Sequence, residues 1–234
     1  MSELNDIGIS RQLDWPRICK LLAIGLTASV LHFIGDMMLG WGVEDETLTG
    51  MMRLLSAFTA APDGVIFAAA LLGMLGMVLE GLSAFGVYRL MAEKAPDYAH
   101  RYRSGIFGYV IFGACGFHVP YCAIAFLMKH GVDVALLSRC YTYFVLPSLA
   151  LFWVFFLLMQ ITQIKAFAKG LTPYSKGSWV FSMPVGMLAA AAMNVFGNRS
   201  WVNAVNCAMV SIGAVWMFGG LLAKAKKAQS ANGK

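Results

Sequence analysis

The sequence predicts an all-α, integral membrane bundle of six transmembrane helices, with both termini in the cytoplasm. Apolar residues make up 59% of the 234 residues and charged residues only 13%, whereas a soluble domain carries about 25% charged residues. The apolar residues gather in long runs, and Lys and Arg lie at the ends of those runs. The spans use up most of the chain, so we expect a single membrane domain over residues 1–234.

Six runs are long enough to cross a bilayer as helices, which takes about 20 mainly apolar residues. The predicted spans cover residues 21–43, 64–90, 105–128, 141–164, 179–197 and 202–223.

Local sequence signals mark the first three spans. The first is followed by an acidic stretch, residues 44–46. The second starts directly after Pro62 and Asp63, which is a common start signal for a helix. The third contains Pro120, which removes a backbone hydrogen bond near the middle of the span and is expected to kink it.

Aromatic and basic residues mark the last three spans. Tyr141 and Trp179 begin the fourth and fifth spans, and Trp201 directly precedes the sixth, as in the aromatic belts at membrane surfaces. The sixth ends in a basic stretch, residues 224–227, which is typical of the flank of a final span.

The distribution of Lys and Arg predicts the orientation. With the N-terminus in the cytoplasm, fourteen of these residues lie inside and four outside, which agrees with the positive-inside rule for short loops. The inside set is Arg11, Arg17, Lys20, Arg89, Lys94, Arg101, Arg103, Lys165, Lys169, Lys176, Lys224, Lys226, Lys227 and Lys234, and the outside set is Arg53, Lys129, Arg139 and Arg199.

The composition excludes some function classes. The net charge of +6 does not indicate nucleic-acid binding, because the basic residues form no patch with interleaved aromatic residues. The five cysteines show no zinc-type spacing. The expected partners are membrane lipids and an apolar small molecule.

His32 and Asp36 form the first candidate site within a span. They lie four residues apart and therefore share one face of a helix. A charged side chain at bilayer depth costs about 3 kcal/mol, so it is seldom kept without a partner or a use. The pair is either an acid–base pair or a buried hydrogen-bonded pair that holds helices together.

Glu80 in the second span is the other acid at depth. Gly73 and Gly76 lie on the same face, one and two turns earlier, and small residues let another helix approach closely. Glu80 is predicted to act as a proton carrier or general acid, with a structural hydrogen bond as the alternative.

His118 lies near the middle of the third span, with Tyr121 on the same face. Counted from the middle of each span, His32, Asp36, Glu80 and His118 fall within a slab roughly 12 Å thick. We therefore predict these four as catalytic residues in one chamber, although depth alone does not say which helix faces meet.

Amides in the last two spans extend this set. Asn194 and Asn206 are predicted to complete a polar cavity and, with Tyr121, to bind substrate; their alternative role is to join helices. Gln160 and Gln163, near the end of the fourth span, are expected at the membrane interface.

No cofactor is predicted. Two histidines and two carboxylates could hold zinc or iron, but the sequence has no HExxH motif, and His100 and His130 lie in loops on opposite sides.

The stretch from Phe33 to Trp41, with Gly35-Asp36 at its centre, resembles the first helix of a bacterial multi-pass membrane protein family of unknown function. The loop pair Arg53-Leu54 and the end of the second span at Tyr88-Arg89 also fit that family. The resemblance covers roughly the first half of the chain. It implies a location in the bacterial inner membrane and implies no activity.

Three functions remain open at this point. The leading hypothesis is a membrane-embedded enzyme that performs acid–base chemistry on a lipid-like small molecule. The second is a proton-coupled carrier or small-molecule binding protein that uses the same residues as a relay. The third is a structural or accessory subunit in which these residues lock the helices.

Overall fold

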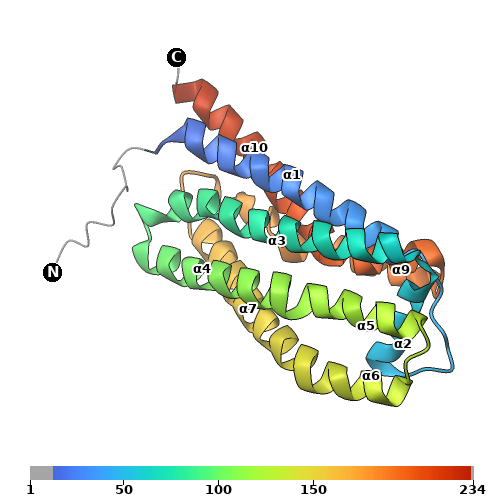
Figure 1. Cartoon of the computed structure of the whole chain (residues 1–234). Coiled ribbons are helices and arrows are strands. Elements are labelled where there is room, and N and C mark those ends of the chain that lie inside the picture. Colours follow the sequence, from blue (N-terminus) through green and yellow to red (C-terminus); the bar gives the residue numbers. More distant parts are fainter. Residues whose placement is uncertain (1–12, 233–234) are drawn as a thin grey trace.

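The computed structural model describes residues 13–232, and all regular structure in that range is helical. Long helices pack side by side in an elongated bundle (Figure 1). Five helical stretches are long and apolar enough to cross a membrane, which confirms a helical protein of the multi-pass type. They are Trp15–Leu39, Asp63–Ala92, Pro96–Lys129, Val134–Ala168 and Met209–Ser230.

Two of these stretches, Pro96–Lys129 and Val134–Ala168, contain a π segment between two α-helices. The 3₁₀ segments are η1, η4 and η5, and the π segments are η2 and η3. In chain order the elements are α1 (Trp15–Leu39), α2 (Gly50–Ser56), η1 (Ala57–Ala60), α3 (Asp63–Ala92), α4 (Pro96–Gly108), η2 (Tyr109–His118), α5 (Val119–Lys129), α6 (Val134–Cys140), η3 (Tyr141–Val145), α7 (Leu146–Ala168), η4 (Lys176–Val180), α8 (Met183–Ala191), η5 (Ala192–Phe196), α9 (Ser200–Cys207) and α10 (Met209–Asn232).

The predicted fifth span is shorter than expected. Its continuous helical part is Met183–Phe196, which rises about 21 Å at 1.5 Å per residue, against about 30 Å for the hydrocarbon core. Pro184 lies in the first turn of this part, and Gly197 stops it with a positive φ of 74°. The predicted sixth span is divided into α9 and α10. A total of six membrane crossings therefore remains a prediction.

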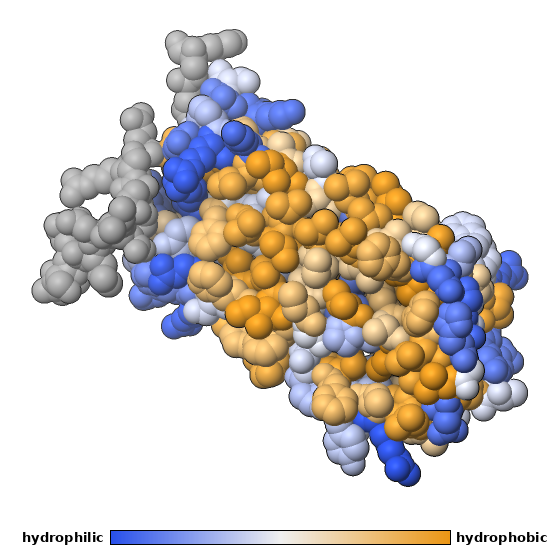
Figure 2. All heavy atoms as spheres, viewed as in Figure 1, coloured by the Kyte–Doolittle hydropathy of each residue, from blue (hydrophilic) through white to orange (hydrophobic). Residues whose placement is uncertain are grey.

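The described chain starts and finishes at the same end of the bundle. The first turn of α1 and the last turn of α10 lie together there (Figure 1). A broad apolar band separates hydrophilic surfaces at the two ends (Figure 2). The cytoplasmic orientation remains a prediction, and Arg11 and Lys234, which entered it, lie outside the described residues.

Two π segments adapt the long helices to proline. The segment η2 ends two residues before Pro120, and η3 ends two residues before Pro147. Proline lacks an N–H and clashes with the carbonyl one turn earlier, and a π segment widens the helix at that place. The predicted disturbance near Pro120 is therefore a widened turn, and His118 is its last residue.

Glycines on α3 let the histidines come close. A Cβ added to Gly76 would lie 2.7 Å from the Cβ of His32, and one added to Gly73 would overlap the imidazole of His118. The prediction that these small residues permit a close approach is confirmed. They allow α1 and the η2–α5 stretch to place imidazoles against α3.

The apolar interior is divided into two clusters, one toward each end of the bundle. Along α1 the first cluster runs from Trp15 to Leu22, and the second begins at Leu39. His32 and Asp36 lie in between. Polar side chains thus occupy the junction between two apolar cores.

We expect Gly73→Ala to destabilise the bundle by about 1–3 kcal/mol, since overpacking at a tight contact has this cost and the new methyl group must displace His118. The matched control is Gly64→Ala on the same helix, where a Cβ meets no atom within 4 Å. Thermal unfolding in detergent measures both. Equal melting temperatures for the two variants would contradict the packing described here.

Candidate functional site

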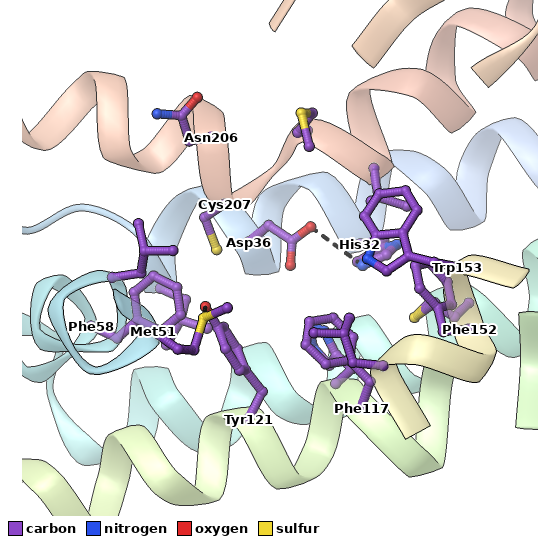
Figure 3. Close-up of a pocket in the computed structure, with 17 residues that line it drawn as sticks. His32, Asp36, Met51, Phe58, Phe117, Tyr121, Phe152, Trp153, Asn206 and Cys207 are labelled. Carbon is purple, nitrogen blue, oxygen red and sulfur yellow. Dashed lines mark hydrogen bonds and ion pairs between the residues drawn. The ribbon is translucent and has the colours of Figure 1, made fainter. Parts of the chain in front are cut away.

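His32 lies between the two buried acids. Its Nε2 is 3.3 Å from Oδ2 of Asp36, one turn later on α1, and its Nδ1 is 3.2 Å from Oε1 of Glu80 on α3. The three residues are only 2–3% exposed. Figure 3 shows the contact between His32 and Asp36. The predicted pair and the second acid therefore meet in one cluster.

Each acid also has a hydroxyl donor from another helix. The Tyr109 hydroxyl donates to Oε2 of Glu80 at 2.6 Å, and the Ser211 hydroxyl lies 2.8 Å from Oδ2 of Asp36 and donates to it. Tyr109 is the first residue of η2, and Ser211 is in α10. These contacts tie four helical stretches together through polar side chains.

Sequence reasoning missed both hydroxyl residues. Ser211 stands in an apolar stretch with no motif around it, so no local signal was available. Tyr109 lies in the same span as His118, nine residues earlier. Its position two to three turns from a buried histidine was the one signal that could have found it.

His118 completes the cluster from the η2–α5 stretch. Its ring meets that of His32 edge-on, with 5.5 Å between the ring centroids and an interplanar angle of 87°. Its Nε2 lies 3.1 Å from the carbonyl oxygen of Ala69, which accepts the hydrogen bond when that nitrogen carries the proton. The structure thus brings all four predicted catalytic residues together.

A cavity of about 320 Å³ adjoins this cluster. Figure 3 shows side chains from several helices pointing into it. His32, Asp36 and His118 form a polar part of the wall, and Glu80 lies behind His32, outside the lining. The remaining wall is mainly apolar and aromatic: Leu39, Met51, Leu54, Phe58, Met77, Phe117, Tyr121, Leu149, Phe152, Trp153, Asn206, Cys207, Met209 and Val210.

The short segment α2–η1 closes one end of this cavity. Met51 and Phe58 contribute to the lining, and both contact Tyr121 on α5: the phenol hydroxyl donates to Sδ of Met51 at 3.3 Å, and the two aromatic rings meet at 5.5 Å. Arg53 forms an ion pair with Glu44 at 2.8 Å, which ties α2 to the preceding loop.

A second cavity of about 310 Å³ adjoins the first and has a polar rim. Tyr121 and Asn206 line both cavities, while Asn194 lines only the second, where its side-chain oxygen accepts a hydrogen bond from Asn206. The amide of Asn203 donates to the carbonyl of Gly42 at 2.9 Å. The predicted amides therefore both join helices and line cavities.

Gln160 and Gln163, expected at the membrane interface, are fully buried within the protein. Their depth in a membrane remains a prediction. Gln160 accepts the backbone N–H of Met183 at 3.1 Å, and Gln163 donates to the carbonyl of Phe181 at 2.9 Å. The two amides thus supply hydrogen-bond partners for backbone groups of Phe181 and Met183, where the chain leading into α8 packs on α7.

The cluster also offers ligand atoms for a metal ion. His32, Asp36 and His118 each provide one such atom, and these atoms lie within 4.8 Å of one another. Among residues 13–232 this is the one group of three or more His, Cys, Asp or Glu residues with such spacing.

Fold and site together define a class: a helical protein of the multi-pass membrane type, in which a buried histidine–carboxylate cluster adjoins an apolar cavity. The chain belongs to the family of unknown function DUF6796, which matches residues 3–228. No curated protein and no solved structure matches the chain. The resemblance to an uncharacterised family is thus confirmed, and its bacterial origin and Gly-Asp motif remain predictions.

We expect Tyr109→Phe to destabilise the protein by about 1–3 kcal/mol, because Oε2 of the buried Glu80 loses its donor. Tyr143→Phe is the control, since Tyr143 is 71% exposed. Thermal unfolding in detergent compares the two. A Tyr109→Phe protein as stable as the control would mean that the hydroxyl does not support Glu80.

Proposed function

We propose that this protein is an enzyme of the cell membrane that acts on a lipid-like or other apolar small molecule. The observation that carries the proposal is the position of His32, Asp36 and His118 in the wall of a mainly apolar cavity. Ligand sites typically combine an apolar lining with a few converging polar groups. A purely structural cluster needs no such space beside it.

The wall chemistry matches an apolar body with one reactive polar group. Aromatic and aliphatic side chains around the cavity would hold the body, and Asp36 with His32 would take up or supply a proton at the polar group. Glu80 contacts the other ring nitrogen of His32, so it would orient the imidazole and set its tautomer.

A proton-coupled carrier is the second candidate. The contacts from Asp36 through His32 to Glu80 and on to Tyr109 form a row that leads away from the cavity. Such a row is what a proton relay across helices would use. A carrier would respond to a pH gradient in liposomes, whereas an enzyme would convert its substrate in detergent.

We expect Asp36→Asn to lower turnover by about 10²–10⁴-fold, the usual contribution of a general acid–base group. The measurement is a comparison of products by mass spectrometry after the purified protein has been incubated with a total lipid extract. Asp133→Asn, at an exposed helix N-cap, is the control. Identical product profiles for wild type and Asp36→Asn would count against an enzyme.

We expect Leu149→Trp to exclude the bound molecule, because the indole fills part of the cavity. Native mass spectrometry of protein purified in mild detergent would detect a co-purifying molecule in the wild type and its loss in the variant. Leu151→Trp, at a side chain 41% exposed on the same helix, is the control. Equal retention in both variants would place the molecule elsewhere.

A further inference from the structure

We propose that His32, Asp36 and His118 bind one divalent first-row transition metal ion, zinc or iron. The role of this ion rests on the proposed function, because the ion would face the same cavity and the same substrate. Two imidazoles and one carboxylate are a donor set that proteins use for both ions. No sequence motif marks this set, because the ligands come from α1 and from the end of η2.

The one ligand spacing that is known in detail fits this ion size. Two ligands at about 2.0–2.1 Å from a tetrahedral ion lie about 3.3 Å apart. Nε2 of His32 and Oδ2 of Asp36 are 3.3 Å apart. The third ligand atom, from His118, lies within 4.8 Å of these two.

Both imidazole ligands are also held from their far side, as ligands of protein-bound metals usually are. Nδ1 of His32 contacts Glu80, and Nε2 of His118 contacts the carbonyl of Ala69. Ser211 donates to Oδ2 of Asp36, the oxygen that faces His32. When the far nitrogen of an imidazole carries the proton, its other nitrogen keeps a lone pair for the ion. When Nε2 of His118 donates to the Ala69 carbonyl, Nδ1 of His118 therefore keeps its lone pair.

The contact between His32 and Asp36 also calls for a positive charge. If Nδ1 of His32 donates to Glu80, then Nε2 and Oδ2 of Asp36 face each other as two acceptors unless a proton or a metal ion lies between them. With both acids ionised, a single proton there leaves one uncompensated negative charge in an apolar bundle, which either a second proton or a divalent ion would balance. A divalent ion with neutral imidazoles balances both carboxylates.

Three protein ligands leave at least one position on the ion open, as in catalytic rather than structural sites. The cavity lies beside all three ligands, so the open position would face the bound molecule. Glu80 would then be a positioning residue that acts through His32.

The test is metal analysis of the full chain, purified without a histidine tag. We expect about one zinc or iron ion per chain by elemental mass spectrometry, and after chelation, uptake of one Co²⁺ with the visible absorption of a low-coordinate site. The elemental ratio distinguishes zinc from iron. His118→Ala should lose the ion, and His130→Ala, at an exposed histidine, should keep it.

Glu80→Gln tests the positioning role without removing a ligand. It stays informative even if a variant that lacks a ligand does not fold. We expect its affinity for Co²⁺ to fall about 10–100-fold, as for other residues that hold metal ligands from behind. Gel filtration and circular dichroism would show that the variant is folded. Affinity equal to the wild type would overturn this role.

The outcomes separate this inference from the proposed function. A wild-type protein that neither contains nor takes up a metal ion overturns the site. Asp36-dependent turnover by a fully chelated protein also overturns it, and leaves the enzyme in place. One bound ion without any turnover or bound molecule supports the site and counts against the enzyme.

Discussion

A buried imidazole held between two carboxylates is the constraint on which this bundle depends. Removing a charged group from water is costly unless it is paired and hydrogen-bonded. His32 contacts Asp36 and Glu80, and hydroxyl groups of Tyr109 and Ser211 contact the acids in turn. These contacts require α1, α3, η2 and α10 to meet at one depth, so the polar cluster determines how the long helices are placed.

Backbone features make that meeting possible. Gly73 and Gly76 remove side chains from α3 where the histidines approach. The π segment η2 has Tyr109 at its start and His118 at its end, and both point to the cluster. A regular α-helix over the same residues would rotate one of them away from the other, since each added residue turns the helix by about 100°.

The cluster is satisfied on its far side and faces a cavity on its near side. Glu80 and the Ala69 carbonyl contact His32 and His118 from behind, and Ser211 donates to Asp36, whereas the wall of the cavity is apolar apart from a few groups. This one-sided arrangement suits a reactive centre, because preorganised groups then meet a molecule that excludes water. It serves the proposed enzyme with or without the metal ion that we infer.

The sequence by itself determined the class and the list of important residues. Apolar runs and sparse charge predicted a helical membrane-type bundle, because a backbone without water must satisfy its hydrogen bonds within helices. Acids and histidines within those runs stood out, since such groups are rarely kept there without a use. Hydropathy was less reliable for the fifth span, where Pro184 and Gly197 shorten the helix.

Tertiary structure alone decided which faces meet. Depth placed His32, Asp36, Glu80 and His118 in one slab, but the rotation of each helix about its axis depends on packing against all of its neighbours. For the same reason Ser211 carried no signal, Tyr109 carried only its spacing from His118, and the burial of Gln160 was not foreseen. The cavity too is a property of the packed helices, because its lining comes from segments distributed over most of the chain.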